Sequence, residues 1–238
     1  MPAKILFQYQ STSGAAFAVA PALVPAIEQL IDQVRGDIAE RRAAGHFVGY
    51  MSVPLGADGG GDFLTSTALA AHVKERVQNE FGAQLWMLNP AAYSLPASAG
   101  GGDYMAAWAD VIAGADGSGS DFDLVYFVGP SDGWHFFGAN GLDRLGAVAS
   151  WLAQRAATDP AYKAIEDDPV ARRNFIRYYG MRGSVMYDMG CHDEWNIVRG
   201  INLKRAIGDA LAVYFDGQAI APGAYQQAVA PGDQTTPR

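Results

Sequence analysis

The chain has 238 residues and a mass of 25.3 kDa; half of its residues are hydrophobic and 18% are charged. This composition excludes an intrinsically disordered protein, because disordered chains lack the apolar content that a core needs. The formal net charge of −8 disfavours a protein that binds nucleic acid irrespective of sequence, since such binding depends on a basic surface. A single cysteine, Cys191, excludes an intramolecular disulfide framework and a zinc site made of cysteines alone.

The N-terminal region predicts no membrane span and no secretion signal. Residues 4–9 predict a short strand or an extended arm. The apolar run over 15–27 is interrupted by two prolines and is shorter than the roughly 18–20 residues that a spanning helix needs. Polar residues at 8–13 occupy the place where a signal peptide would be apolar. We therefore expect a reduced, cytoplasmic protein with neither membrane nor nucleic-acid partners.

Helical and extended patterns alternate along the chain from residue 25 to residue 157. Apolar residues three and four positions apart indicate amphipathic helices, whereas short apolar runs bounded by Gly, Pro or Asn indicate buried strands. In chain order the expected elements are a helix over 25–44, a strand over 46–55, a glycine-rich loop over 56–62, a helix capped by Thr65 or Ser66 and ending near Phe81, a strand over 84–88, a loop over 97–102, a helix capped by Asp103, a strand over 123–128, a turn over 129–133 and a helix over 141–157.

Strands that alternate with helices predict parallel βαβ units and a sheet covered on both faces. The expected fold class is therefore α/β, a three-layer sandwich around a mainly parallel sheet. No internal repeat or linker divides the chain. The expected organisation is a single domain over 1–220, a core over 46–157, a helical C-terminal extension over 158–220 with helices over 171–179 and 197–212, and a loose tail over 221–238.

Polar groups follow the first two central strands, where ligands bind in open α/β sheets. Ser52 lies at the first strand end and is suited to holding a sugar hydroxyl. The loop that follows contains Gly60 and Gly61, whose N–H groups are suited to an anion unless the loop is only a surface connection. At the second end, Asn89 suits a ligand hydroxyl or the cap of the next turn. Tyr93 suits stacking against a ligand ring or packing in the core.

The third strand end, residues 129–137, combines a carboxylate, an imidazole and several aromatic side chains. Asp132 is a candidate nucleophile or general base, and His135 is a candidate acid or base. Trp134 is a candidate stacking wall and Ser131 a candidate ligand contact. The alternative is a tight turn followed by core aromatics. We expect this stretch to be the principal site.

Cys191 to Trp195 form a further polar cluster outside the predicted sheet. Two functions are compatible with it, a metal site and a Cys/His nucleophile. Adjacent residues point in different directions, so all four polar side chains cannot converge on one ion. Alternatively, Asp193 and Glu194 open the following helix, where acidic side chains suit the helix dipole. We expect neither a metal nor a cofactor.

The sequence resembles the nucleoside 2-deoxyribosyltransferase-like group between residues 46 and 157. The resemblance is carried by residues 50–55, 89–90, 123–129 and 138–149. It implies a flavodoxin-like fold and an enzyme that cleaves or transfers at an N-glycosidic bond. The group has a catalytic Glu on the helix after its third strand. This helix has none, and Asp143, one position from the expected place, is the only carboxylate near it.

Two functional hypotheses follow. In the first, the protein is an enzyme acting on a nucleoside or nucleotide, with Asp143 or Asp132 as the carboxylate and His135 moving a proton. In the second, the fold is a non-catalytic domain that binds a nucleotide or metabolite at the same strand ends. A third possibility is a thiol enzyme using Cys191. The expected partner is a small, nucleoside- or sugar-phosphate-like molecule, and a homo-oligomer is compatible with the sequence.

Overall fold

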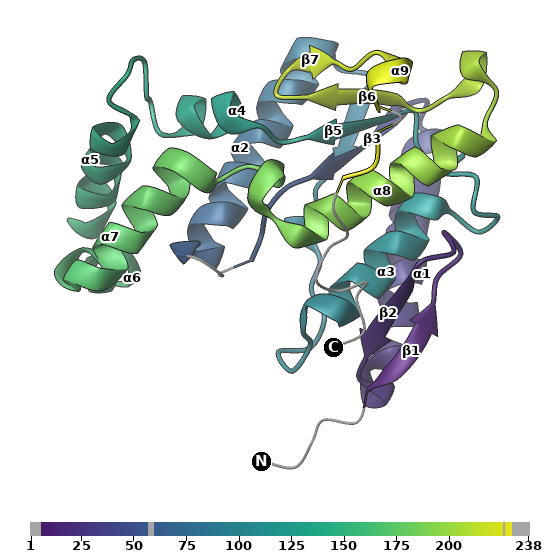
Figure 1. Cartoon of the computed structure of the whole chain (residues 1–238), viewed down its shortest axis with the longest axis horizontal. Coiled ribbons are helices and arrows are strands. Elements are labelled where there is room, and N and C mark those ends of the chain that lie inside the picture. The colour runs from purple at the N-terminus through teal and green to yellow at the C-terminus, as the bar shows by residue number, and fades with distance from the viewer. Residues whose placement is uncertain (1–5, 57–59, 226, 230–238) are drawn as a thin grey trace.

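The computed structural model describes residues 6–56, 60–225 and 227–229, and these form a mixed α/β fold (Figure 1). Within this part of the chain the central sheet has five strands, in the order β4-β3-β5-β6-β7. The first four are parallel, and β7 runs antiparallel to β6. The prediction of a mainly parallel sheet is confirmed. The strands are β3 (Phe47–Ser52), β4 (Leu85–Leu88), β5 (Leu124–Phe127), β6 (Ala212–Phe215) and β7 (Gln218–Ala219).

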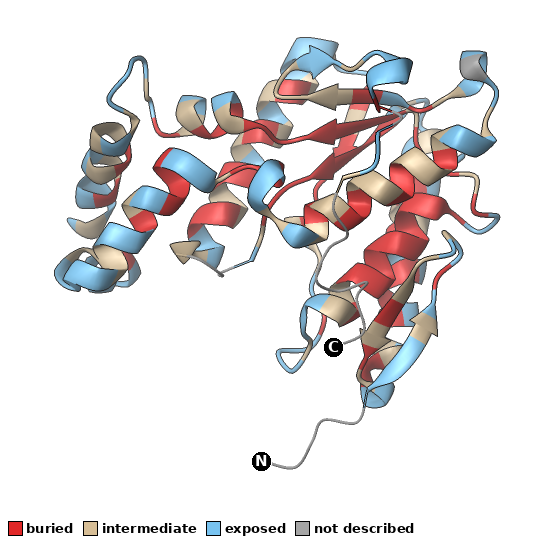
Figure 2. Ribbon diagram, in the orientation of Figure 1, coloured by how far each residue is buried: buried red, intermediate tan, exposed pale blue. Residues whose placement is uncertain are grey.

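The order of the strands reverses at β3. From β3 the chain passes to β4 at one edge, and then crosses back to add β5 and β6 on the other side. Every residue of β5, and of β3 after Phe47, is buried, which requires cover on both faces (Figure 2). The carboxyl ends of β3 and β5 therefore meet at the switch point, where open α/β sheets place their ligands.

Helices α1 (Val24–Ala43), α3 (Gly101–Ala113) and α8 (Met189–Lys204) pack in series, with α3 contacting both of the others. Helix α2 (Phe63–Phe81) contacts β4 and the short helix α4 (Pro130–Phe136). The apolar stripe predicted for the first helix is confirmed, because its periodic side chains are all buried. They are Ile27, Leu30, Ile31, Val34 and Ile38.

Three further helices form a group on the left of Figure 1, away from the sheet. They are α5 (Arg144–Ala156), α6 (Pro160–Asp167) and α7 (Pro169–Arg177), and they contact one another. A π-helical turn, Tyr178–Arg182, links α7 to the rest of the chain. Their shared core is aromatic, so this group holds together by ring packing. The rings include Phe136, Phe137, Trp151, Tyr162, Phe175 and Tyr179.

An N-terminal hairpin packs against α3. Strand β1 (Phe7–Gln10) pairs with β2 (Ala16–Val19), and Asp110 of α3 accepts hydrogen bonds from Tyr9 and Thr12. The sequence predicted only the first strand. Among the described residues, none of the helices combines the length and the apolar character needed to cross a bilayer. The short helices are Pro21–Leu23, Pro90–Ala92, Val185–Tyr187, Ile207–Asp209 and α9 (Pro222–Tyr225).

The C-terminal part of the chain differs most from prediction. The helix predicted over 197–212 begins earlier, at Met189, and ends at Lys204; residue 212 begins β6. The expected core over 46–157 therefore lacks the fourth parallel strand, and the helical extension supplies it. Local periodicity cannot reveal a four-residue strand whose hydrogen-bonding partner, β5, lies about 90 residues earlier. Of the tail predicted to be loose, Tyr225 is buried, while residues 226 and 230–238 lie outside the described chain.

Several local predictions were also wrong. The cap of α2 is Asp62, whose carboxylate accepts from the Thr65 N–H, because an Asp placed three residues before that N–H reaches it directly. Asp103 is not a cap but the third residue of α3, and its carboxylate accepts from the Gly100 and Ala20 N–H groups. The turn predicted over 129–133 is instead the start of α4, with Pro130 in the first turn.

Candidate functional site

Asp132 is buried on α4 with both carboxylate oxygens engaged. Oδ1 pairs with the Arg76 guanidinium and accepts from the Tyr126 hydroxyl at 2.9 Å, and Oδ2 accepts from the Gly129 N–H at 2.8 Å. Burial raises the pKa of Asp132, and the Gly129 N–H and Arg76 oppose that rise. Asp132 therefore closes the first turn of α4 and ties it to α2. The hydrogen bonds leave no free oxygen for a nucleophile.

Ser131, next to it, is bound to the end of β6. Its N–H and hydroxyl both donate to the Asp216 carboxylate, at 2.7 and 2.8 Å, and the Asp132 N–H also donates to it. Asp216 adopts a left-handed conformation with φ of 53°. A Cβ at Gly129 would overlap the Asp216 side chain, so the glycine is needed for this approach. An internal carboxylate thus occupies the donors that were expected to face a ligand.

His135 is exposed and pairs with His72 of α2 across 2.9 Å, from Nδ1 to Nε2. Burial lowers the pKa of His72, and the neighbouring His135 and Arg76 lower it further. Trp134, also on α4, lies against the guanidinium of Arg144, 3.2 Å from the ring centroid. Both predicted side chains therefore contact the helices beside α4.

Asp143 is exposed at the start of α5. Its carboxylate accepts from the Gly146 N–H at 2.8 Å, so it is the N-cap of that helix. A Cβ at Gly146 would overlap the same carboxylate, which shows how closely the cap is seated. The carboxylate at which the resemblance pointed thus lies on the helical group.

The first and second strand ends are also occupied by internal contacts. A Cβ at Gly60 would come within 2.7 Å of the Asn174 carbonyl oxygen, and one at Gly61 within 2.6 Å of the Gly56 carbonyl oxygen. Residues 57–59 of this loop lie outside the described chain. At the second end two further side chains have structural partners. Asn89 accepts from the Ala91 N–H at 3.0 Å, and the Tyr93 hydroxyl donates to Asp37 at 2.7 Å.

Ser52 belongs to a different cluster, beneath α8. It ends β3 with no exposed surface, and Tyr50, two residues earlier, points to the same face of the sheet. The Tyr50 hydroxyl donates to Glu194 Oε1 at 2.5 Å. Ser52 lies close enough to Glu194 and Cys191 for its hydroxyl to lower the pKa of each. The end of the central strand β3 thus faces the carboxyl group of Glu194.

Glu194 is buried, and burial raises the pKa of its carboxyl group to about 8. The hydroxyls of Ser52 and Tyr50 oppose that rise, whereas the charges of Asp188 and Asp193 add to it. Among the described residues, neither Glu194 Oε2 nor Ser52 Oγ has a partner with full hydrogen-bond geometry. Burial therefore favours the protonated form of Glu194, and its Oε2 has bonding capacity to spare.

Cys191 lies one helical turn before Glu194 on the same face of α8. It is buried, and burial together with the charges of Asp188 and Glu194 raises the pKa of its thiol well above the usual value. Asp188 caps the helix by accepting from the Cys191 N–H at 2.9 Å. The thiol is thus kept neutral, which disfavours it as a nucleophile.

The sequence contained a signal for this cluster. The alternation of Tyr50 and Ser52 along a strand places both side chains on one face, and the spacing of Cys191 and Glu194 does the same on a helix. The prediction that Asp193 and Glu194 open a helix was wrong, because α8 already begins at Met189. What the sequence lacked was the contact between β3 and α8, which joins residues 144 positions apart.

Within the described residues, no three or more His, Cys, Asp or Glu side chains are grouped so that they could hold a metal ion. No family model matches this chain, and no curated protein or solved structure is significantly similar to it. Function must therefore be argued from the site itself. The Tyr50–Ser52–Cys191–Glu194 cluster, named here the β3–α8 cluster, is the strongest candidate.

Proposed function

We propose that the protein is an enzyme that cleaves or transfers at an N-glycosidic bond, and that Glu194 is its catalytic carboxyl group. The observation that carries the proposal is the buried Glu194 beside the end of β3, with a pKa of about 8 and an unpartnered Oε2. A carboxyl group that stays protonated at neutral pH in an apolar setting is suited to act as a general acid.

The proposed chemistry follows from the groups around Glu194. As a general acid, Glu194 gives its proton to the leaving base as the glycosidic bond breaks and positive charge develops on the sugar. Water, or an acceptor base in a transfer reaction, then forms the new bond to the sugar carbon and returns a proton to the Glu194 carboxylate. The negative charges of Asp188 and Asp193, which already act on Glu194, favour that positive charge. The Ser52 hydroxyl, which has no exposed surface, lies beside the carboxyl group and helps to orient it. The Tyr50 hydroxyl holds the carboxyl group in position.

Glu194 takes the role that the sequence suggested for Asp143 or Asp132. Asp143 is exposed as the cap of α5, and Asp132 is engaged by Arg76, Tyr126 and Gly129. Like the helix of the resembling group, α8 follows the third strand of the sheet, but only after α4 to α7 have intervened.

The proposal includes a finer description of the fold. We propose a three-layer, flavodoxin-like arrangement, with α1, α3 and α8 on one face of the sheet and α2 and α4 on the other. Numbered by appearance, the parallel strands follow the order 2-1-3-4 that such doubly wound sheets use. The side chains support it, because Tyr50 of β3 bonds to α8 while Tyr126 of β5 bonds to Arg76 of α2.

A second candidate function is a non-catalytic domain that binds a nucleotide or metabolite. One observation favours it: Asp132, after β5, and Asp216, after β6, are both committed to internal hydrogen bonds. Such a domain would bind its ligand at the β3 end and return it unchanged. The two candidates therefore differ in the fate of the ligand rather than in its place.

The test combines a thermal-shift screen of nucleosides, nucleotides and sugar phosphates with analysis of the products. A ligand present at 100 times its Kd stabilises the fold by about 2.7 kcal/mol, which such a screen detects. We expect a nucleoside-type ligand and released free base from the wild type. Glu194→Gln should lose at least about 100-fold in turnover, the scale of general-acid catalysis. Asp143→Asn is the matched control and should retain activity.

Two results would overturn the enzyme proposal. If a stabilising ligand is recovered chemically intact, the binding domain is favoured instead. If Glu194→Gln folds normally and turns over as fast as the wild type, Glu194 is not the acid. Tyr50→Phe adds a finer readout, because loss of its hydrogen bond to Glu194 should shift the pH profile of turnover rather than abolish it.

A further inference from the structure

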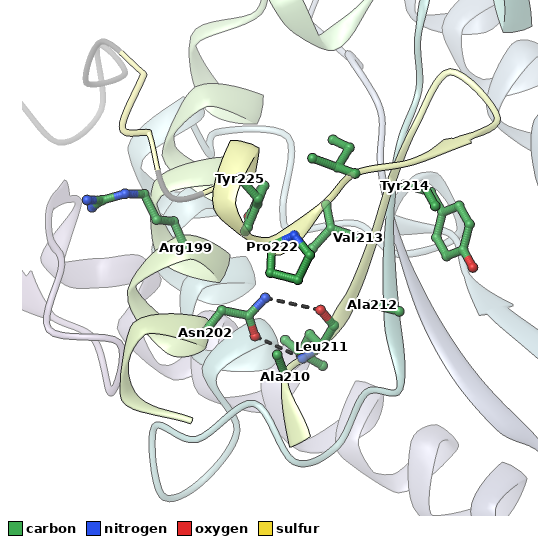
Figure 3. A pocket seen from close by; sticks show the side chains of 11 residues that line it. Arg199, Asn202, Ala210, Leu211, Ala212, Val213, Tyr214, Pro222 and Tyr225 are labelled. Atoms are coloured by element: carbon green, nitrogen blue, oxygen red, sulfur yellow. Dashed lines mark hydrogen bonds between the residues drawn. The ribbon is translucent and has the colours of Figure 1, made fainter. Parts of the chain in front are cut away.

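A pocket of about 260 Å³ lies between α8, α9 and the β6–β7 hairpin (Figure 3). It is lined near the amino end of β6 by Leu211 and Ala212, so it lies away from the strand carboxyl ends where Ser52 and Glu194 are found. Its other walls include Pro222 and Tyr225 of α9. The pocket is therefore separate from the β3–α8 cluster.

The polar groups of this pocket already bond to one another. The Asn202 side chain donates to the Leu211 carbonyl at 3.1 Å and accepts from the Leu211 N–H at 2.8 Å (Figure 3). The Val213 carbonyl accepts from Ile220, and the Tyr225 hydroxyl donates to a backbone carbonyl. A polar ligand group buried here would compete for partners that are taken, and an unmet polar group costs free energy. An apolar ligand pays no such cost.

Charge does not enter the pocket either. In Figure 3 the guanidinium of Arg199 points away from Leu211 and Pro222, and only the aliphatic part of the side chain is directed along the wall. The remaining lining side chains are mostly aliphatic. Its volume is slightly below the range of drug-sized sites, so the ligand it fits has about the size of a single aromatic ring.

One wall of the pocket leads to the neighbour of Glu194. The Tyr225 ring packs on Trp195 with centroids 4.5 Å apart, and its hydroxyl donates to the Trp195 carbonyl oxygen at 3.0 Å. Trp195 directly follows Glu194 on α8 and also packs on Phe127 of β5. Any ligand that fixes Tyr225 therefore also restrains the turn of α8 that carries Glu194.

We propose that this pocket is a second binding site, for a small uncharged apolar molecule, and that its occupation stabilises the turn of α8 around Glu194 through Tyr225 and Trp195. The binding part stands without the proposed function, whereas any effect on turnover rests on it. Ligand and substrate would then be coupled through the same helix, and that coupling is reciprocal for binding.

The test uses toluene as the probe and benzoate as its charged counterpart, with tryptophan emission as the readout of binding. We expect a saturable change with toluene that is lost in Trp195→Phe, and at least a tenfold weaker response to benzoate. Ala219→Phe places a ring at the pocket wall and should abolish the response. Ala153→Phe, at an exposed site on α5, is the matched control and should leave it intact.

Amide hydrogen exchange then tests the connection to α8 without requiring turnover. Saturating toluene should slow exchange over residues 190–200 in the wild type and in Ala153→Phe, but not in Ala219→Phe. An equal emission response in Ala219→Phe, equal binding of benzoate, or no saturable response would overturn the binding site. Binding with unchanged exchange would overturn the connection. Absence of nucleoside turnover would overturn only the proposed function.

Discussion

Two buried carboxyl groups lie beyond the ends of two neighbouring strands, β5 and β3. They differ in the groups that surround and bond to them. Asp132 follows β5 and has a guanidinium, a phenol hydroxyl and a backbone N–H on its two oxygens. Glu194 faces the end of β3, where the hydroxyls of Tyr50 and Ser52 and the charges of Asp188 and Asp193 act on it. Burial raises the pKa of both carboxyl groups, and that of Glu194 to about 8.

The difference separates a structural carboxylate from a reactive one. A charged group whose oxygens are all bonded holds elements together and has little left for a ligand. A buried carboxyl group without a cation is kept neutral, retains a proton to give and leaves an oxygen unpartnered. Because burial alone does not distinguish the two, the bonding partners decide the interpretation.

The largest loss of stability is expected when Asp132, whose two carboxylate oxygens are both bonded, is removed. Asp132→Ala removes the buried one of the two carboxylates that pair with Arg76, together with the hydrogen bonds to Tyr126 and Gly129. We expect a loss of about 3–5 kcal/mol in the free energy of unfolding, measured with urea. Glu80→Ala removes the exposed partner of the same guanidinium and should cost at most about 0.5 kcal/mol. Equal losses in the two variants would contradict a structural role for Asp132.

Glu194 should make the stability of the fold depend on pH. Its folded-state pKa of about 8 lies above the ordinary value of 4.5, so the folded protein holds the proton more tightly than the unfolded chain. Stability is therefore complete below about pH 4.5 and falls as the pH rises toward 8. Glu194→Gln removes that fall, which we expect to be about 3–4 kcal/mol between pH 5 and pH 8, because the slope approaches about 1.4 kcal/mol per pH unit.

Urea unfolding of wild type and Glu194→Gln at pH 5, 6.5 and 8 measures this effect. The two proteins should differ least at pH 5, and the variant should be relatively more stable at pH 8. Glu80→Gln, at an exposed position, controls for the loss of a surface charge. Parallel profiles for wild type and Glu194→Gln would show that Glu194 is ionised normally, and the comparison with Asp132 would fail.

Much of the fold follows from local patterns in the sequence. The helix of Ile27 to Ile38 and the strands β3, β4 and β5 were predicted because each carries its own periodicity or apolar run. Strand β6 was not, because the helix predicted over 197–212 extended into its first residue. The N-terminal β2 was missed for a different reason: its apolar residues belong equally well to the longer apolar run over 15–27.

The candidate site was less accessible from the sequence. Ser52 was identified from its place at a strand end, and Glu194 was noted only as part of a polar run. Their meeting depends on α8 packing over β3 after α2 to α7 have intervened in the chain, which no local pattern encodes. Asp132 and Asp143, by contrast, were predicted as catalytic candidates, but their carboxylates accept hydrogen bonds at the starts of helices. The same residue types that perform catalysis also cap helices, and only the structure shows which N–H groups they accept from.

A third prediction concerns Asp216, which holds Ser131 against the end of β6. Asp216→Ala loses three hydrogen bonds, whereas the left-handed φ of 53° is strained in the wild type and the variant alike. We expect a loss of about 2 kcal/mol from those hydrogen bonds. Asp216→Gly loses the same bonds but relieves the strain, so it should cost about 1 kcal/mol less. A larger loss in the glycine variant, by urea unfolding, would contradict this account.

The smallest loss of stability is expected at Asp143, the exposed carboxylate to which the resemblance pointed as a catalytic residue. Asp143→Ala removes the cap that accepts from the Gly146 N–H and should cost about 1 kcal/mol by urea unfolding. Asp143→Ser keeps a capping oxygen and should recover most of that loss, because a cap needs an acceptor rather than a charge. If Asp143 instead served catalysis, the serine variant would be as stable as the wild type yet inactive. Measured together, stability and base release therefore decide whether the reactive carboxyl group of this fold lies on α5 or on α8.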